Sequence, residues 1–153
     1  MFKNMILIGG AVVSKLVRGK LKFFLVKSSD GVDWEIPKLT VRKTESSVRA
    51  VLRMIGEQGG MRARIINEAS RYSTNQVVNG KSVTQKIFYY ALIHRADSGE
   101  SVGFFQSEWY DYAKAYKKLK LKREKSSLSS ANKILKEWWK KRRKRREKVA
   151  DES

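Results

Sequence analysis

The residues best suited to chemistry lie close together at positions 53–58, which read RMIGEQ. In a helix, Glu57 and Gln58 follow Met54 by three and four positions and therefore face the same side. A hard cation such as Mg²⁺ takes oxygen ligands, often one or two carboxylates together with substrate phosphates. One carboxylate and one amide are few ligands, and Arg53 can pair with Glu57 at the i, i+4 spacing. These residues taken alone favour a solvated helix face, with cation binding as the alternative.

A helix must position these side chains, and the surrounding sequence predicts one. Apolar residues recur at i, i+3, i+4 and i+7, which is the spacing of one buried stripe. The members of this stripe are Val48, Val51, Leu52 and Ile55. Ser46 is a favourable N-cap, and Gly59-Gly60 is a favourable stop. We therefore expect a helix that ends just before the glycines, buries this stripe and presents Glu57 on another face.

The other elements follow from alternation and turn signals. Strands are predicted where β-branched and aromatic residues alternate with polar ones. The predicted strands cover residues 5–14, 20–29, 61–74 and 81–96. Turn sequences at 17–20 and 77–82, the second containing Asn-Gly, join them into two hairpins. Residues 107–119 are expected to form the start of a helix, and another helix is expected to cover 126–148, with Ser129 or Ser130 as its N-cap. The order of strands, helix, strands and helix indicates an α+β domain.

In residues 39–61, the acids, an arginine and a glycine occur at the spacing of a known sequence motif. From Leu39 the chain runs through five residues to Glu45, then seven residues, then RMIGEQGGM. This resembles the Nudix box of the Nudix hydrolases. The family pattern is Gly, five residues, Glu, seven residues, then Arg-Glu-apolar-any-Glu-Glu-any-Gly-apolar. The matching residues are Glu45, Arg53, Ile55, Glu57, Gly60 and Met61; the departures are Leu39, Met54 and Gln58.

The resemblance extends beyond the box to most of the chain, over residues 4–137. The segment WEIPK resembles the lead-in of the family, GGAVV and KFFLVKSSDG resemble its first two strands, and SEWYDYAKAYKKL resembles its late helical segment. The resemblance implies a Nudix-type α/β/α sandwich with a mixed central sheet. We therefore expect a Nudix-like domain over 1–137 and a basic C-terminal helical tail over 138–153.

The resemblance also implies a reaction, which is hydrolysis of a diphosphate linkage in a nucleotide-like substrate with Mg²⁺ or Mn²⁺. It gives catalytic roles to Glu57, Glu45 and Arg53, and it makes Glu57 and Gln58 the candidate metal ligands. Lys38 matches a lysine of the family pattern. Arg42 and Lys43, in the basic loop 39–44, join Lys38 as candidates for contact with substrate phosphates.

The departures from the pattern predict weak activity or none. Met54 stands where the family has a carboxylate, and a thioether neither takes up a proton nor holds Mg²⁺. Gln58 keeps an oxygen but loses the charge, and Leu39 adds a Cβ where a tight turn is expected. Phosphoryl transfer depends on charge neutralisation and an activated water, so losing a base and a ligand together lowers its rate steeply. The acids that could replace them are Glu68, Glu100, Glu108 and Asp97.

The net charge of +19 is concentrated near the C-terminus, where residues 114–148 hold 17 Lys and Arg against three acids. Phosphates attract such a run through counterion release, and tryptophan can stack on exposed bases. The candidate nucleic-acid-binding residues are Trp138, Lys140, Lys141, Arg142, Arg143, Lys144, Arg145 and Arg146. One other interpretation is a solvated tail with Trp138 or Trp139 packed on the core. Another is binding to an anionic membrane surface, which the scarcity of apolar residues disfavours.

Composition excludes several classes of site. The chain has no cysteine and a single histidine, His94, so disulfides and a zinc site with the usual ligands are excluded. GEQGG at 56–60 lacks the Lys-Ser/Thr ending of a phosphate-binding P-loop. The early apolar stretch MILIGGAVV is too short to span a bilayer, and we expect neither a membrane span nor a signal peptide. The lack of cysteine fits a reducing compartment, and we expect a cytoplasmic protein.

Two functions therefore remain open. The first is a Nudix-type hydrolase of a nucleoside-diphosphate-linked substrate with a weakened metal site. The second is a catalytically inactive Nudix-fold protein that binds RNA or a ribonucleoprotein through its basic C-terminal region. The first needs a replacement acid near Glu57, whereas the second needs only the charged surface.

Overall fold

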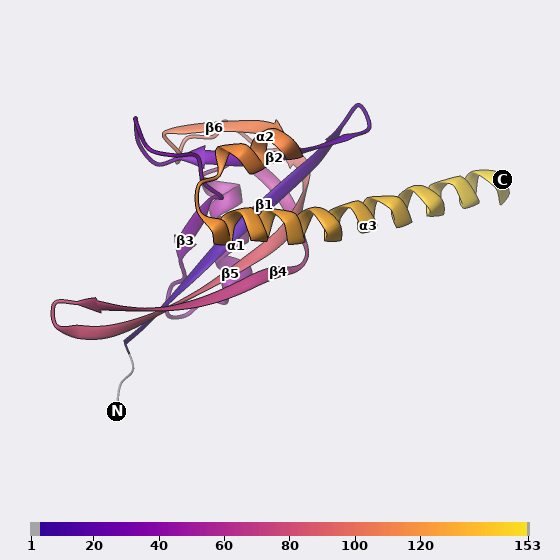
Figure 1. Cartoon of the computed structure of the whole chain (residues 1–153). Helices are drawn as coiled ribbons and strands as arrows, with labels where there is room; N and C mark the ends of the chain where they lie inside the picture. Colours follow the sequence, from indigo (N-terminus) through magenta and orange to yellow (C-terminus); the bar gives the residue numbers. More distant parts are fainter. Residues whose placement is uncertain (1–3, 153) are drawn as a thin grey trace.

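The computed structural model describes residues 4–152 and is built on one six-stranded sheet (Figure 1). The strands are β1 (Asn4–Val17), β2 (Lys20–Lys27), β3 (Lys38–Thr40), β4 (Met61–Val78), β5 (Lys81–Asp97) and β6 (Gln106–Asp111). The helices are α1 (Ser47–Glu57), α2 (Tyr112–Lys118) and α3 (Lys122–Glu152). The sheet order is β4-β5-β1-β2-β6, and β3 also pairs with β1. The β1–β5 pair is parallel and the other pairs are antiparallel, so the sheet is mixed as expected.

Both predicted hairpins form, and backbone conformation explains why. Arg18 and Gly19 have φ values of 52° and 80°, and Asn79 and Gly80 have 54° and 75°. A two-residue turn with positive φ at both positions matches the right-handed twist of the strands that it joins. Asparagine and glycine adopt this conformation most readily, which is why the Asn-Gly signal at 77–82 located the β4–β5 turn correctly.

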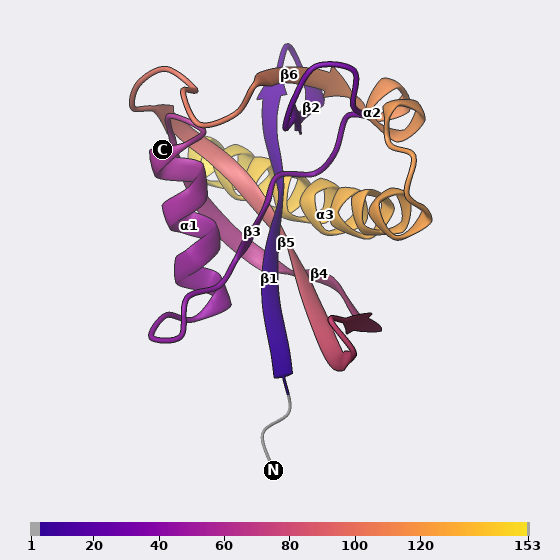
Figure 2. The same ribbon diagram turned by 90° about the vertical axis from the view of Figure 1, so that its left-hand side faces the viewer.

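The sheet separates two apolar cores, giving the expected α/β/α sandwich (Figure 2). On one face, α1 packs Val51, Met54 and Ile55 against Phe24 and Leu92 of the sheet. On the other face, α2 and α3 bury a second cluster against the sheet, which includes Phe23, Tyr89, Ala115, Leu128 and Leu135. Successive residues such as Phe23 and Phe24 point to opposite faces, because side chains alternate along a strand.

The glycine pair of β1 lets neighbouring groups approach the sheet from both faces. A Cβ on Gly9 would lie 2.7 Å from a methyl group of Val51 in α1. A Cβ on Gly10 would lie 2.5 Å from the ring of Tyr89 in β5. These separations are far below van der Waals contact, so glycine is required at both positions for the observed packing.

Helix α1 begins and ends where the sequence predicts, but it buries a different face. The Ser46 side chain accepts a hydrogen bond from Arg49 N at 3.1 Å, as expected of an N-cap. However, Val48 and Leu52 are 39% and 37% exposed, whereas the buried residues are Ala50, Val51, Met54 and Ile55. The predicted stripe is therefore wrong for Val48 and Leu52. Met54 carries no charge, so α1 can turn this position into the core.

The C-terminal third also departs from expectation in two places. The segment predicted as helix from 107 onward first forms strand β6, because it completes an antiparallel pair with β2 before α2 begins at Tyr112. Helix α3 starts at Lys122, so neither Ser129 nor Ser130 is its N-cap. The helix is continuous through position 137, and the predicted boundary between domain and tail lies inside it. No helix within residues 4–152 is long and apolar enough to cross a membrane.

Candidate functional site

Glu45 and Arg53 form the most extensively hydrogen-bonded part of the predicted site. Arg53 donates from Nη2 to Glu45 Oε1 at 2.7 Å and from Nε to Oε2 at 3.2 Å. The backbone N–H of Arg42 donates to the same carboxylate at 3.1 Å. The Arg53 guanidinium, helped by this N–H, lowers the pKa of Glu45 to about 2. Glu45 is therefore a stable anion that fixes the start of α1 and the loop before it, which makes it a poor proton acceptor.

Glu57, the predicted metal ligand, points into solvent. Its side chain is 68% exposed, and its one ion pair among the described residues is a loose contact of 4.0 Å with Arg53 Nη1. The predicted i, i+4 pair therefore exists, but it is secondary to the Glu45–Arg53 pair. Five pockets border α3, and Glu57 lines none of these five. The carboxylate is accessible but unenclosed.

The position where the family pattern has a carboxylate belongs to the core. Met54 is fully buried in the cluster between α1 and the sheet. Phe24 and Leu92 lie in the same cluster, and Phe104 and Trp109 pack against it. A carboxylate introduced here would lose its hydration without gaining a partner, which is costly. Met54 therefore contributes packing between α1 and the sheet.

The loop of residues 98–103 lies against the end of α1 and partly covers Gln58. The carbonyl oxygen of Gly60 accepts hydrogen bonds from Ser98 N at 2.8 Å and from Gly99 N at 3.1 Å. The carbonyl of Gln58 accepts from Ser101 Oγ at 3.2 Å and Gly103 N at 3.3 Å. A Cβ on Gly103 would lie 2.5 Å from Cβ and Cγ of Gln58, so the loop backbone rests directly on this side chain. The candidate acid Glu100 lies in this loop and is exposed.

Lys38, predicted to contact phosphate, is engaged by a buried carboxylate that sequence reasoning missed. Its Nζ lies 2.8 Å from Glu124 Oε2 and donates to the Ile36 carbonyl at 3.0 Å. Glu124, whose side chain is 2% exposed, also accepts from Ile36 N at 3.0 Å and from the Tyr89 hydroxyl at 2.8 Å. Burial, together with the neighbouring Glu124 charge, raises the pKa of Tyr89. The sequence feature that could have revealed this contact is Glu124, the one acid in the cationic segment 117–125.

The remaining predicted residues are spread over the surface. Arg42 and Lys43 are exposed in the loop before α1. Among the replacement acids, Glu68 pairs with Arg71 at 2.8 Å and Asp97 with His94 at 2.8 Å, while Glu108 is exposed on β6. Within the described part of the chain, no group of three or more His, Cys, Asp or Glu could hold a metal ion. The residues present therefore do not fit a protein-built Mg²⁺ site.

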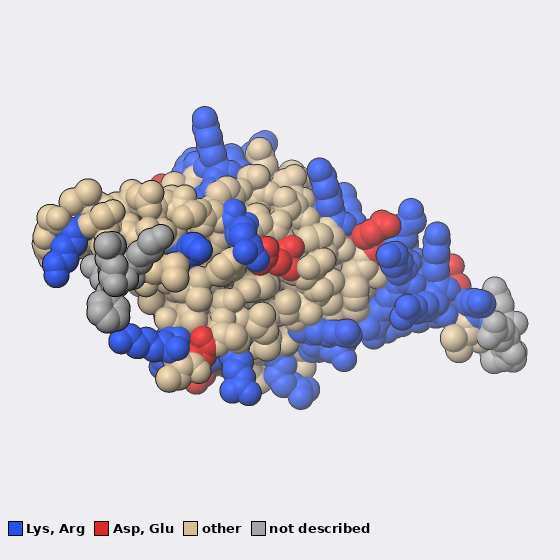
Figure 3. Space-filling view, turned by 90° about the horizontal axis from the view of Figure 1, so that it is seen from below, with Lys and Arg blue, Asp and Glu red and all other residues tan. Residues whose placement is uncertain are grey.

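The basic residues of α3 form a separate surface. The helix packs on the sheet through Leu128, Ala131 and Leu135, and then runs past it toward the C-terminus (Figure 1). Between positions 140 and 150 its residues are exposed, except that Arg142 is half-buried. On the face seen in Figure 3, Lys and Arg side chains gather at this end of the molecule, with few acidic side chains among them. The cationic run 140–148 is therefore open to a large anionic partner.

The two tryptophans lie where the helix leaves the sheet. Trp138 and Trp139 are both half-buried and pack against the core beneath α3, with their rings in edge contact at 4.8 Å. The guanidinium of Arg142 lies 5.2 Å from the Trp138 ring centre. Both tryptophans thus anchor the helix while keeping part of their surface accessible beside the cations.

Comparison with known proteins agrees on the fold. No protein-family model matches the sequence, and no curated protein matches it significantly. Among solved structures, the C. elegans Ap4A hydrolase is similar at 21% identity with a TM-score of 0.62, over 86% of this chain and 98% of that chain. The NUDIX domain of Shewanella oneidensis NrtR, solved with ADP ribose, is similar at 17% identity with a TM-score of 0.61, over 88% of this chain and 90% of that chain.

A NUDIX hydrolase from Nitrosomonas europaea is similar at 15% identity and TM-score 0.62, over 86% of this chain and 89% of that chain. The three matches each cover 86–88% of this chain. The chain therefore has the Nudix hydrolase fold.

Proposed function

We propose that this chain binds single-stranded RNA through the exposed cationic run of α3, and that hydrolysis of diphosphates at the end of α1 is weak or absent. The observation that carries the proposal is the exposure of the run: residues 140–148 are almost entirely exposed, and they follow the part of α3 that packs on the sheet through Leu128, Ala131 and Leu135. Each Lys or Arg that meets a phosphate releases counterions, so affinity grows with the number of contacts. A helix with cations on every side can offer several of them at once.

The state of the α1 end supports the second half of the proposal. Three properties that metal-assisted hydrolysis needs are missing there: a base, a second charged ligand and an enclosed site. Met54 is buried, Gln58 is neutral and partly covered, and Glu57 is exposed to solvent. Lys38 is held by Glu124, which leaves Arg42 and Lys43 as exposed cations in this region.

The RNA-binding proposal is tested by removing charge from the tail of the full-length chain. We expect Lys144→Gln, Arg145→Gln and Arg146→Gln in combination to weaken binding of a labelled single-stranded RNA at least roughly tenfold, since each phosphate contact contributes separately. The measurement is fluorescence anisotropy at fixed ionic strength. All three residues are exposed, so the fold should be unchanged.

A matched control is Arg49→Gln, Lys81→Gln and Lys86→Gln, which removes the same charge from exposed positions outside α3. If both triple variants bind RNA equally, the contact is not made by the tail, and the proposal fails. The chain should not be shortened after Asn132 for this purpose, because Leu135 is buried and its loss would damage the core.

Hydrolysis remains the second candidate function, and one observation favours it. The Glu45–Arg53 pair and α1 keep the frame of the box, and the accessible Glu57 could meet a cation brought by a diphosphate substrate. The test is release of phosphate or nucleotide from a panel of nucleoside-diphosphate derivatives with Mg²⁺ or Mn²⁺. Turnover that disappears in Glu57→Gln would establish the enzyme, and we expect no such turnover.

A further inference from the structure

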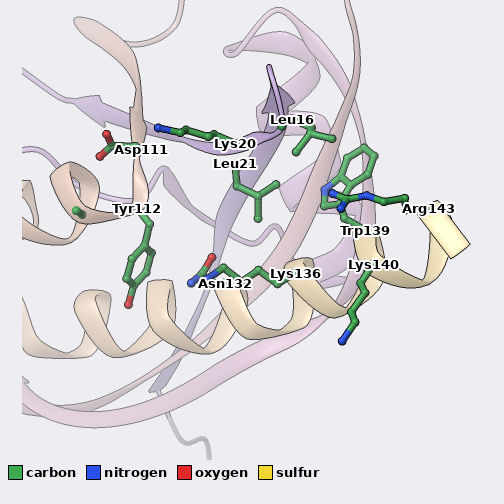
Figure 4. A pocket seen from close by; sticks show the side chains of 12 residues that line it. Leu16, Lys20, Leu21, Asp111, Tyr112, Asn132, Lys136, Trp139, Lys140 and Arg143 are labelled. Carbon is green, nitrogen blue, oxygen red and sulfur yellow. The ribbon is translucent and has the colours of Figure 1, made fainter.

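A pocket of about 680 Å³ lies on the opposite side of the sheet from α1, between the β1–β2 hairpin, the start of α2 and the middle of α3 (Figure 4). Its apolar lining comes from Leu16, Leu21, Tyr112 and Trp139. The volume is in the range of pockets that hold small organic ligands. The position is remote from the Nudix box, so neither the box nor the resemblance assigns it a ligand.

Two polar atoms around this pocket lack partners. Asn132, which is 7% exposed, has a buried side-chain oxygen with no hydrogen-bond partner among the described residues, and the same is true of Trp139 Nε1. The Asn132 amide lies between the side chains of Tyr112 and Leu21 (Figure 4). Leaving such groups unpaired in a buried place is costly, so a ligand offering one donor and one acceptor would be stabilised here.

The charges of the pocket select an anion. Four cationic side chains line it, which are Lys20, Lys136, Lys140 and Arg143. Asp111 is the one acid in the lining, and its carboxylate is occupied as the N-cap of α2, where it accepts from Lys114 N at 2.9 Å. Lys140 and Arg143 also belong to the cationic run of α3, so the pocket and the run form one continuous surface.

We propose that this pocket holds one unstacked nucleotide of a bound RNA strand, a proposal that rests on the RNA-binding function above. A nucleobase combines a flat apolar face, which suits Tyr112 and Leu21, with edge donors and acceptors for Asn132 and Trp139 Nε1. The adjoining phosphates lie toward Lys20 and Arg143, and the strand continues along α3. The pocket thus adds recognition of unpaired bases to a tail that contacts only phosphates.

The experiment compares single-stranded RNA with duplex RNA of the same sequence, using the full-length chain. A duplex can contact the tail through its phosphates. Its bases are paired and stacked, so they cannot enter the pocket. We expect Asn132→Ala to weaken single-strand binding roughly fivefold, through loss of the amide contact, and to leave duplex affinity unchanged. Trp139→Phe, which removes the indole N–H but keeps a ring, should act the same way. Trp109→Phe, on the α1 face of the sheet, is the matched control outside this pocket.

A variant at an exposed position tests the pocket without disturbing the core, which Asn132→Ala could do. Lys20 lines the pocket from β2 and is exposed, whereas Lys81 is exposed in the distant β4–β5 hairpin. Lys20→Gln should lower single-strand affinity roughly threefold more than Lys81→Gln, because it alone meets a phosphate of the inserted nucleotide.

The outcomes separate the two proposals. Strong RNA binding in which Asn132→Ala, Trp139→Phe and Lys20→Gln affect single strand and duplex alike would overturn the pocket proposal and leave the tail proposal standing. Failure of the unmodified chain to bind either RNA would overturn both. A fluorescent base, 2-aminopurine, can also be placed in the single-stranded RNA. Its fluorescence should change when the RNA binds the unmodified chain, and the size of this change should be smaller with Trp139→Phe.

Discussion

At the scale of residues, burial decides how much an ion pair contributes. The Lys38–Glu124 and Glu68–Arg71 pairs both have charged atoms 2.8 Å apart. The first has side chains 17% and 2% exposed and a carboxylate that also accepts bonds from Ile36 N and Tyr89. The Arg71 side chain of the second is 66% exposed, where water competes for both charges. The two ion pairs therefore have the same distance but contribute very differently to stability.

This contrast gives the first prediction. Glu124→Ala should lower the free energy of unfolding by roughly 3–5 kcal/mol, because Lys38 and the Tyr89 hydroxyl lose a buried partner. Glu68→Ala should change it by about 1 kcal/mol or less. Urea denaturation of both variants measures the difference, and equal effects would show that the buried network is not a stabilising anchor of α3.

A second prediction at this scale concerns pH. Because Arg53 lowers the pKa of Glu45 from 4.5 in the unfolded reference to about 2, the folded state binds fewer protons than the unfolded state between these values. The stabilisation is therefore complete above about pH 4.5 and is lost as the pH falls toward 2. The difference in Tm between the unmodified chain and Glu45→Gln should be constant at neutral pH and shrink over this window. A difference that grows with acidity would contradict the assignment.

Which contacts could be predicted at this scale follows from sequence separation. The spacing of the box located Glu45 and Arg53 in the same site, only eight residues apart. The partner of Lys38 lies 86 residues away and is brought in by the packing of α3, which no local pattern encodes. The exposure of Glu57 was likewise not predictable, because it depends on how α1 is rotated about its axis on the sheet.

At the scale of elements, glycines set how closely α1 approaches the sheet. Gly9→Ala should cost roughly 1–3 kcal/mol, since the added Cβ would meet Val51 at 2.7 Å and push α1 outward. Gly56→Ala, in an exposed position of the same helix with 3.9 Å to the nearest atom, should instead stabilise by up to about 1 kcal/mol. Thermal unfolding of the two variants tests this, and a neutral Gly9→Ala would mean that α1 packs less tightly than described.

The same scale explains where element prediction succeeded and failed. Hairpins with Asn-Gly or Arg-Gly turns are locally encoded, and both were located correctly. The predicted helical residues from 107 onward first form β6 because five of them, together with Gln106, pair with β2, a tertiary interaction that overrides local preference. The early start of α3 has a similar origin, since Glu124 and Leu128 become buried only when the helix packs on the sheet.

At the scale of the whole molecule, the two faces of the sheet carry different kinds of side chain. The face under α1 holds the Glu45–Arg53 pair nearby and buries Met54 among apolar and aromatic side chains. The face under α3 carries the cations of the helix, Trp138 and Trp139, and the 680 Å³ pocket. The fold could be inferred from sequence because the spacing pattern of the box is present, whereas the burial of Met54 and the exposure of Glu57 depend on tertiary packing.

The most direct test of this account is the salt dependence of single-stranded RNA binding. For single strands, the logarithm of the association constant falls with the logarithm of salt concentration by roughly 0.7 per phosphate contact. We expect a steep slope for the unmodified chain, reduced by roughly 2 when Lys144, Arg145 and Arg146 are replaced by glutamine. An affinity that barely responds to salt, or an identical slope in the triple variant, would contradict the central claim that the projecting end of α3 holds the RNA backbone.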